Sequence, residues 1–325
     1  MKLIKLLQAT GIALFVISCE KEVAETPVAS ITINKTEFTI NETMEINFTG
    51  VADQVTVFPG DNMQNYDLRE QSNTGLVVNK KLFTYAYAVP GVFKVVCVAS
   101  THTENAAELK YDTCSVTVTV TDDVTEINRI SCPQVRYDEV FAEKMADDNW
   151  LMILPRRIKL GTSTPAINIA RQRLRFYIPS DSTKVSIDGK SYSNTQNYDL
   201  SVPLDILVKS NAGTERPYKL YTVNYAEFAS FKLLGATGTL VRNEYDYSTF
   251  VMEVTLPTGT DVSNAVPEFT TTAPTEKVYI GDKEQTSGTS AVDFTKDVIY
   301  RLVSTSADNP AMQAESTVSV KIRHQ

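Results

Sequence analysis

Strict alternation of apolar and polar residues recurs along this chain and limits what it can fold into. Residues 115–120 read Ser-Val-Thr-Val-Thr-Val, so three valines alternate with hydroxyl side chains. A period of two places the valines on one face of a strand and the hydroxyls on the other, which is typical of a half-buried antiparallel strand. Similar strands are expected at 221–225 and 317–322. The pattern predicts an all-β protein.

The spacing of these strands indicates domains in tandem. Val118, Val223 and Val320 lie about 100 residues apart, close to the length of one immunoglobulin-like (Ig-like) β-sandwich. Residues 184–190 and 277–283 also share one pattern, a short strand followed by an Asp-Gly or Gly-Asp turn that suits a tight hairpin. This region therefore has the pattern of one domain that has been duplicated.

Polar joints between these blocks give the expected boundaries, for example Thr-Asp-Asp at 121–123. We expect three antiparallel β-sandwich domains in tandem behind a short leader. Residues 137–146 form the one segment where a short helical turn is expected. The expected divisions are a signal peptide over 1–18, a lipidated tether over 19–29, and sandwich domains over 30–122, 123–226 and 227–325.

The amino-terminal segment predicts secretion and lipid attachment. A basic start with Lys2 and Lys5 precedes a mostly apolar run over 6–17. The run is shorter than the roughly 20 apolar residues that span a bilayer, so it has the form of a signal peptide. Val-Ile-Ser-Cys at 16–19 resembles a bacterial lipobox. This resemblance implies cleavage before Cys19 and acyl chains on Cys19 that anchor the protein to a membrane.

Charge narrows the compartment and the partners. Glu20, Glu22 and Glu25 follow the lipid site and resemble the acidic signal that sends some Gram-negative lipoproteins to the outer face of the cell. We therefore expect a lipid anchor in the outer membrane facing the exterior, with a solvated tether on the periplasmic face as the alternative. The net charge of −8 repels nucleic-acid backbones, so no nucleic-acid partner is expected.

Three cysteines remain beyond the lipid site. Alternation places Cys97 and Cys114 on inward faces of two strands that form one hairpin. A disulfide between them fits an oxidising compartment, and two buried free thiols are an equal alternative. Cys132 has no obvious partner and is expected to be a buried thiol.

The first sandwich carries a motif with a family resemblance. Residues 83–95 give a strand with alternating aromatics, a Pro-Gly turn and an apolar strand, and residues 57–61 read Val-Phe-Pro-Gly-Asp. Together with Tyr66 and Arg69 they resemble a PKD-like domain of surface lipoproteins from gut commensals. Asn62 follows Asp61 where the common PKD motif has glycine. The resemblance implies an Ig-like sandwich and assigns no activity.

The second and third sandwiches resemble Ig-like modules of Sus-type glycan-uptake lipoproteins. The residues that carry this resemblance are Leu-Pro-Thr-Gly-Thr-Asp at 256–261, Val-Pro-Glu-Phe at 266–269 and Lys-Val-Tyr-Ile at 277–280. The second sandwich departs from the pattern through a longer and more basic segment around Arg156 and Arg157. The resemblance implies an accessory role beside an outer-membrane transporter, with a polysaccharide or oligosaccharide as ligand.

Motifs for catalysis and metal binding are absent from the sequence. His102 and His324 belong to no Ser-His-Asp or His-x-x-x-His pattern, and there is no Gly-x-Ser-x-Gly elbow or phosphate-binding glycine loop. Asp61, Asp67 and Asp282 fall in expected loops but lack the spacing of a calcium loop. We therefore expect no enzymatic activity, no metal and no cofactor.

Exposed aromatic side chains beside polar residues are the candidates for stacking on a sugar. Trp150 follows Asp-Asp-Asn and is either such a platform or the core tryptophan of a sandwich. Tyr245 and Tyr247 lie in a polar loop, where they form either a platform or an ordinary hairpin tip. Tyr192 and Tyr198 flank a Ser/Asn/Gln stretch and carry the same two alternatives.

The sequence thus favours a non-enzymatic cell-surface lipoprotein that binds or presents a glycan beside an uptake system. The alternative is an adhesion or spacer protein that holds a protein partner, such as an adhesin subunit, away from the membrane. Both functions use the same tandem sandwiches and the same lipid anchor.

Overall fold

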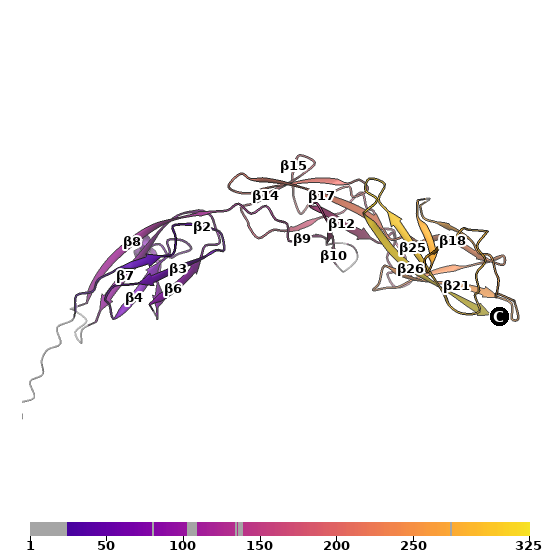
Figure 1. Cartoon of the computed structure of the whole chain (residues 1–325), viewed down its shortest axis with the longest axis horizontal. Coiled ribbons are helices and arrows are strands. Elements are labelled where there is room, and N and C mark those ends of the chain that lie inside the picture. The colour runs from indigo at the N-terminus through magenta and orange to yellow at the C-terminus, as the bar shows by residue number, and fades with distance from the viewer. Residues whose placement is uncertain (1–24, 80, 103–108, 134, 136–138, 274) are drawn as a thin grey trace, which may run out of the picture. The chain divides into compact units, whose positions relative to one another are not determined.

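The computed structural model describes residues 25–325 except 80, 103–108, 134, 136–138 and 274. The signal peptide and the lipidation site Cys19 lie outside the described residues. The chain forms two compact units, the first ending at Val120 and the second running from Thr121 to Gln325. Each unit is built from β-sheets, so the all-β prediction is confirmed (Figure 1).

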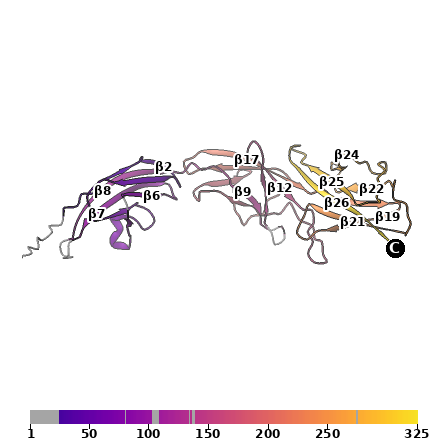
Figure 2. The same ribbon diagram turned by 60° about the horizontal axis from the view of Figure 1, so that its bottom comes forward.

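The first unit is a sandwich of two sheets with one 3₁₀ helix, η1 (Tyr66–Gln71) (Figure 2). One sheet has three strands, in the order β1 (Ile31–Ile33), β3 (Thr43–Phe48) and β6 (Leu82–Ala86). The other sheet has five strands, in the order β2 (Glu37–Thr39), β8 (Lys110–Thr121), β7 (Gly91–Thr101), β4 (Gln54–Phe58) and β5 (Leu76–Val78).

Alternation directs the side chains of this unit as expected. In β3 every second residue is buried, including Met44 and Ile46. Along β8 the apolar positions Val118 and Val120 are buried, while the threonine between them and those on either side are exposed. The predicted hairpin is confirmed, because β7 and β8 pair antiparallel over their whole length. Apolar faces of the two sheets thus pack on each other and exclude water from the core.

The second unit contains two sandwiches with the same strand order, which we call the second and third sandwiches. The short sheet of the second sandwich is β10 (Val140–Phe141), β9 (Arg129–Cys132) and β13 (Arg175–Tyr177). Its long sheet is β11 (Glu143–Lys144), β12 (Asn149–Leu154), β17 (Glu215–Asn224), β16 (Leu204–Lys209), β14 (Lys184–Ile187) and β15 (Lys190–Ser191).

The third sandwich repeats this order strand for strand. Its short sheet is β19 (Ala236–Thr237), β18 (Phe228–Leu233) and β22 (Glu268–Thr271). Its long sheet is β20 (Thr239–Arg242), β21 (Thr249–Leu256), β26 (Gln313–His324), β25 (Val298–Thr305), β23 (Lys277–Ile280) and β24 (Lys283–Glu284). The strands β14 and β23 are those whose sequences predicted the duplication.

Two local expectations were wrong. The sheets are not purely antiparallel, because β12 pairs parallel with β17 and β21 pairs parallel with β26. The segment expected to form a helical turn instead carries β10 and β11 among its described residues. Both short strands pair with a longer neighbour, β9 or β12, so sheet hydrogen bonds replace a helical turn that the sequence only weakly favours.

Each repeated sandwich has its own hydrophobic core. The second is centred on Trp150, Met152 and Leu220, and the third contains a cluster of four rings. The rings in contact are Phe228, Phe231, Phe269 and Tyr300.

The joint between the repeated sandwiches is itself buried. Leu151, Tyr221 and Val223 of the second sandwich pack with Met312 and Ala314 of the third. The connecting residues are also held. Ala226 is fully buried, and its carbonyl accepts a hydrogen bond from Ser316 Oγ at 2.6 Å. Glu227 is 2% exposed and forms an ion pair with Arg242. Apolar and polar contacts together fix this joint.

Candidate functional site

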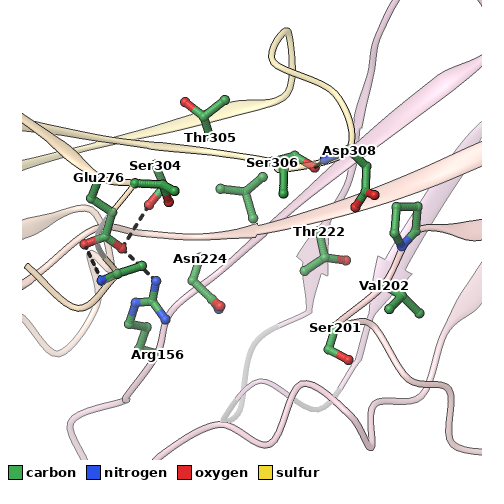
Figure 3. A pocket seen from close by; sticks show the side chains of 15 residues that line it. Arg156, Ser201, Val202, Thr222, Asn224, Glu276, Ser304, Thr305, Ser306 and Asp308 are labelled. Carbon is green, nitrogen blue, oxygen red and sulfur yellow. Dashed lines mark hydrogen bonds and ion pairs between the residues drawn. The ribbon is translucent and has the colours of Figure 1, made fainter.

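A polar cleft of about 170 Å³ opens beside the buried joint (Figure 3). Its walls come from five segments of the chain. Arg156 follows β12, Thr222 and Asn224 end β17, and Ser201 precedes β16. The third sandwich supplies Glu276 before β23 and residues 304–308, which are the end of β25 and the start of the loop that leads to β26. The cleft exists only because the two sandwiches pack together.

An ion pair between the two sandwiches forms one wall. Arg156 Nη2 lies 2.7 Å from Glu276 Oε1, and the Glu276 side chain is only 1% exposed. Glu276 also accepts hydrogen bonds from the hydroxyl of Thr272 and the backbone N–H of Ala273, at 3.0 and 3.1 Å. The Ser304 hydroxyl lies 3.4 Å from the same carboxylate. These donors offset the cost of burying the charged carboxylate of Glu276. Glu276 therefore holds the side chains of this wall together.

Two polar atoms of the cleft have unused hydrogen-bonding capacity within the described chain. The hydroxyl oxygen of Thr222 and the Nε of Arg156 are buried and have no hydrogen-bond partner there. A buried polar group without a partner costs about 1–3 kcal/mol, so such groups are uncommon unless something else binds them. Both atoms belong to residues that line the cleft. They are polar atoms in the wall of the cleft whose hydrogen-bonding capacity the described protein leaves unused.

The remaining lining is rich in hydroxyl and carboxylate groups. Ser201, Thr305, Ser306 and Asp308 face the cleft together with the amide-bearing Asn224 (Figure 3). Hydroxyl groups both donate and accept, and carboxylates accept, so this set can bind a ligand that carries several hydroxyls. No histidine or cysteine is present among the lining residues. The lining therefore offers hydroxyl, amide and carboxylate groups as hydrogen-bonding partners.

Two other clefts lie at equivalent positions in the second and third sandwiches. One, of about 380 Å³, lies between β13 and the β14–β15 hairpin and is lined by Phe176, Lys184 and Tyr192. A second of about 380 Å³ occupies the equivalent position in the third sandwich, beside Phe269 and Lys277. Because both copies of the sandwich have this cleft, it reflects the open edge between the two sheets and is a weaker candidate for a specific site.

Trp150 is not a sugar platform. It is 2% exposed, lies in the middle of the second core and pairs through β12 with Leu220 of β17. A platform has to expose one face of its ring, which Trp150 does not. Of the two alternatives for this residue, the core tryptophan is confirmed.

The side chains of Tyr192 and Tyr198 also pack mainly against other residues of the second sandwich. Their rings stack with centroids 6.0 Å apart, and the Tyr192 hydroxyl donates to the Leu174 carbonyl at 2.8 Å. Burial, with a smaller contribution from Tyr198, raises the pKa of Tyr192 to about 12. Tyr198 is 8% exposed, and its hydroxyl accepts a hydrogen bond from the Ser193 backbone N–H. Tyr192 is partly buried and lines the cleft at the open sheet edge.

The structure separates the two tyrosines of the polar loop. Tyr245 is 80% exposed at the tip, whereas Tyr247 is partly buried and packs on the core of the second sandwich. Asn243 and Asp246 hold this loop by accepting backbone hydrogen bonds from Tyr245 and Ser248. Tyr245 is therefore the glycan candidate of the sequence whose side chain is mostly exposed, while Tyr247 belongs to the joint.

The positions of Cys97 and Cys114 agree with the predicted hairpin. Cys97 and Cys114 are directly opposite on β7 and β8, and both are free thiols together with Cys132. Burial raises the pKa of the Cys97 thiol to about 12, with a smaller contribution from Cys114, so a thiol at Cys97 stays protonated. The pairing brings the two residues together for the disulfide that the sequence allows, and that bond stays a prediction.

The described part of the chain lacks a cluster of metal ligands. It contains no group of three or more His, Cys, Asp or Glu side chains arranged to hold a metal ion. Asp61, a loop candidate, accepts a hydrogen bond at 2.9 Å from Tyr85, and burial raises its pKa. The same part of the chain contains no helix of the length and apolar character that crossing a membrane requires.

Comparison with known families gives one match. Residues 18–125 match the model of a family described as "Domain of unknown function (DUF5017)". The match spans the first sandwich and assigns it no activity. No curated protein matches the chain.

Comparison with solved structures finds β-sandwich proteins. A candidate glycoside hydrolase from Bacteroides thetaiotaomicron VPI-5482 is 28% identical over 31% of this chain and 26% of its own length, with a TM-score of 0.22. This chain thus spans about a quarter of that protein. Promiscuous carbohydrate-binding modules of the β-sandwich superfamily are 10% identical over 61% of this chain and 84% of theirs, with a TM-score of 0.24. The immunoglobulin domains 1–5 of Sidekick-1 are 10% identical over 93% of this chain and 60% of theirs, with a TM-score of 0.20.

The cleft is the site that sequence reasoning missed. Its residues come from five separate segments between Arg156 and Asp308, and no two segments form a motif. One signal was present, because the second sandwich departs from its repeat at the basic segment that contains Arg156. A cation with no counterpart in the other copy indicates a contact outside its own sandwich.

Proposed function

We propose that this chain is a non-enzymatic cell-surface lipoprotein that binds a glycan in the cleft between its two repeated sandwiches. The observation that carries the proposal is the pair of unpartnered buried polar atoms, Thr222 Oγ1 and Arg156 Nε, in a wall of hydroxyl and carboxylate groups. A hydroxyl-rich ligand offers donors and acceptors of the kind that this polar wall can bind.

The size and chemistry of the cleft favour a neutral sugar. Its volume of about 170 Å³ suits a single sugar ring or the end of a chain. The charge of Arg156 is already balanced by Glu276, so the wall offers no free cation for an anionic group. Ser201, Ser306 and Asp308 supply further partners for ring hydroxyls. The exposed ring of Tyr245 is a separate surface on which a longer glycan can stack.

The setting of the proposal comes from the amino-terminal sequence. The lipobox ending at Cys19 and the acidic residues after it support a lipid anchor in the outer membrane with the sandwiches outside the cell. The resemblance of residues 256–283 to Sus-type modules supports a place beside an outer-membrane transporter. Replacing Cys19 by alanine then releases the protein from membrane fractions, and protease added to intact cells digests the wild-type protein.

The test of glycan binding is an array of plant, host and microbial polysaccharides probed with residues 20–325, which contain every described residue. We expect binding to at least one neutral glycan and loss of that binding in Thr222→Val. This substitution keeps the shape of the side chain and removes only a hydroxyl that has no protein partner, so it leaves the fold intact. The exposed Thr255→Val is the matched control and keeps binding. Absence of binding across the array contradicts the proposal.

The absence of catalysis is tested on the same ligand. Incubation of the bound glycan with the protein is expected to release no new reducing ends. Release of reducing ends that Glu276→Gln abolishes contradicts this part of the proposal and assigns the buried carboxylate to catalysis.

A spacer or adhesion function is the second candidate, and the buried joint favours it. Met312 and Ala314 lock the third sandwich to the second, and the connection at Ala226 is fully buried. A fixed joint holds the third sandwich in a defined orientation relative to the second, as a spacer requires. Co-purification with a transporter or adhesin subunit, combined with no glycan binding, supports this second candidate over the first.

A further inference from the structure

A group of aromatic and arginine side chains covers the outward face of the short sheet in the second sandwich. The register of β10, β9 and β13 aligns Phe141, Ser131 and Arg175 across the three strands. The next outward row pairs Arg129 with Tyr177. We call Arg129, Phe141, Arg175 and Tyr177 the aromatic–arginine face. Residues between these rows, such as Ile130, point the other way into the core.

The members of this face hold one another in place. The Arg129 guanidinium lies 4.7 Å from the centre of the Tyr177 ring and 5.4 Å from that of Phe141. Glu139 accepts hydrogen bonds from Ser131 Oγ at 2.5 Å and from the Tyr177 hydroxyl at 3.0 Å. The same carboxylate pairs with Arg175 at 3.2 Å. Stacking and the carboxylate together fix both arginines before any ligand arrives.

Of the two arginines on this face, Arg129 has no ion pair with a described carboxylate. Arg175 is neutralised by Glu139, whereas no described carboxylate lies within ion-pair distance of Arg129. Arg129 is exposed, and 43% of the Phe141 surface is exposed beside it. An exposed guanidinium that lies over aromatic rings presents a fork of N–H donors that matches a carboxylate.

The third sandwich shows that the fold does not require this face. The equivalent outward rows of β19, β18 and β22 carry Thr237, Lys232 and Glu268, and then Ser230 and Thr270. The two sandwiches have the same strand order, yet this row is aromatic and cationic in one and small or charged in the other. The aromatic–arginine face is therefore an addition to the fold.

The charge of the region selects the kind of partner. Residues 123–226 contain more lysines and arginines than aspartates and glutamates, while residues 227–325 contain more acids than bases. The face thus lies on the basic part of an acidic chain, and an anionic ligand is directed to it. The rings beside the cation favour a ligand that also has apolar C–H groups, as the faces of a pyranose do.

We propose that the aromatic–arginine face is a second binding site, for the carboxylate-bearing sugars of an acidic polysaccharide. Arg129 pairs with the sugar carboxylate, and Phe141 and Tyr177 contact the C–H face of the ring. The site is separate from the cleft described above, and its existence does not depend on binding there.

The test uses the full-length protein in detergent and measures binding to polygalacturonate and to its fully methyl-esterified form. The two polymers share a backbone and differ in charge. We expect polygalacturonate to bind and the ester to bind roughly tenfold more weakly, because each lost charge-assisted hydrogen bond removes about that much affinity. Arg129→Gln and Tyr177→Ala weaken polygalacturonate binding by a similar factor. Arg129→Lys keeps the charge but loses the fork, and it restores binding only in part.

Controls separate this site from the cleft and from non-specific charge attraction. Lys232→Gln, at the matched row of the third sandwich, leaves polygalacturonate binding unchanged, and so does Thr222→Val in the cleft. The proposal is overturned if polygalacturonate does not bind, if polyglutamate binds equally well, or if Arg129→Gln folds normally and binds as the wild type does. Loss of polygalacturonate binding in Thr222→Val alone also overturns it and assigns the acidic sugar to the cleft.

Discussion

The second and third sandwiches of this chain have the same strand order and different surfaces. Both have a three-stranded sheet packed on a six-stranded sheet, with one parallel pair at the same position in each. Their outward rows differ completely, with Phe141 and Arg175 on one and Thr237 and Glu268 on the other. The shared order depends on the alternation of buried residues, and the outward positions are free to vary. Comparing the two copies therefore distinguishes residues that the fold requires from residues that are available to bind a ligand.

The cores of the two copies also fill the same architecture differently. The second is built around Trp150, which is the one tryptophan of the sequence. The third uses the contacting rings of Phe228, Phe231, Phe269 and Tyr300. Core positions accept such exchanges when the total volume is kept.

Removal of Trp150 is the strongest test that each copy depends on its own core. Trp150→Ala is expected to destabilise the second sandwich by about 3–5 kcal/mol, because it leaves a large cavity. Phe250→Ala, on the corresponding strand β21, has a similar effect on the third sandwich. Tyr245→Ala is the exposed control and changes the free energy of unfolding by less than about 0.5 kcal/mol. Urea unfolding followed by circular dichroism measures all three, and a Trp150→Ala loss below that of the control contradicts the assignment to the core.

The ion pair at the cleft tests whether the two copies are coupled. Glu276→Ala is expected to cost about 3 kcal/mol, because it leaves Arg156 partly buried without its partner. The matched control is Glu315→Ala, which removes an exposed pair with Arg301 and costs about 1 kcal/mol or less. Trp150 fluorescence during denaturation reports the second sandwich, so a shift in that signal for Glu276→Ala shows coupling across the joint. An unchanged tryptophan transition indicates that the two copies unfold independently.

The pH dependence of the second sandwich tests the carboxylate that supports its outward face. Hydrogen bonds from Ser131 and Tyr177, with the charges of Arg175 and Arg129, lower the pKa of Glu139 below 4.5 against the opposing effect of burial. A carboxylate with a lowered pKa stabilises the folded state above its unfolded pKa and loses this contribution as the pH falls through the folded value. Glu139→Gln should therefore reduce stability at pH 7 by less than about 1 kcal/mol, and this difference from the wild type should shrink as the pH falls through the folded pKa of Glu139.

Ser131 provides the control for that measurement. Its hydroxyl makes the largest contribution to lowering the pKa of Glu139, so Ser131→Ala should move the acid transition to higher pH. Nuclear magnetic resonance titration of Glu139 measures the shift directly. A Glu139 pKa at or above its ordinary value contradicts the geometry of the aromatic–arginine face.

Transfer of the face to the third sandwich is expected to have the smallest effect. Ser230→Arg with Thr270→Tyr places the second outward row of one copy on the other. In an Arg129→Gln background this transfer should recover polygalacturonate binding by about twofold to fivefold, since the adjacent row of the recipient sheet carries Thr237 and Glu268 in place of Phe141 and Arg175. Isothermal titration calorimetry measures the recovery, and no recovery shows that the row alone is insufficient.

Much of the fold could be predicted from the sequence, because the signals are local. Alternation identified β8 and β26, and the matched segments at 184–190 and 277–283 identified the duplication. The parallel pairs could not be predicted, since β12 and β17 lie more than 60 residues apart and alternation does not encode direction. The described part of the segment 137–146 was misassigned because two-residue strands depend on their neighbours in the sheet rather than on their own pattern.

The sites were harder to predict for a related reason. Trp150 follows polar residues in the sequence, yet its strand runs directly into the core. Tyr247 is covered by the neighbouring second sandwich, and no local sequence pattern predicts this contact. The cleft and the aromatic–arginine face both depend on register and packing between distant segments. Such sites become visible only when the strand pairing is known.

Hydrogen exchange with and without a bound glycan tests the central claim most directly. With a neutral glycan identified on the array, we predict increased protection at residues 201–203, 222–224 and 304–308, which line the cleft on both sides of the joint. Residues 237 and 268–270 on the third sandwich should exchange at unchanged rates. Protection confined to other segments, with the cleft unchanged, would contradict the assignment of the glycan site to the joint between the two copies.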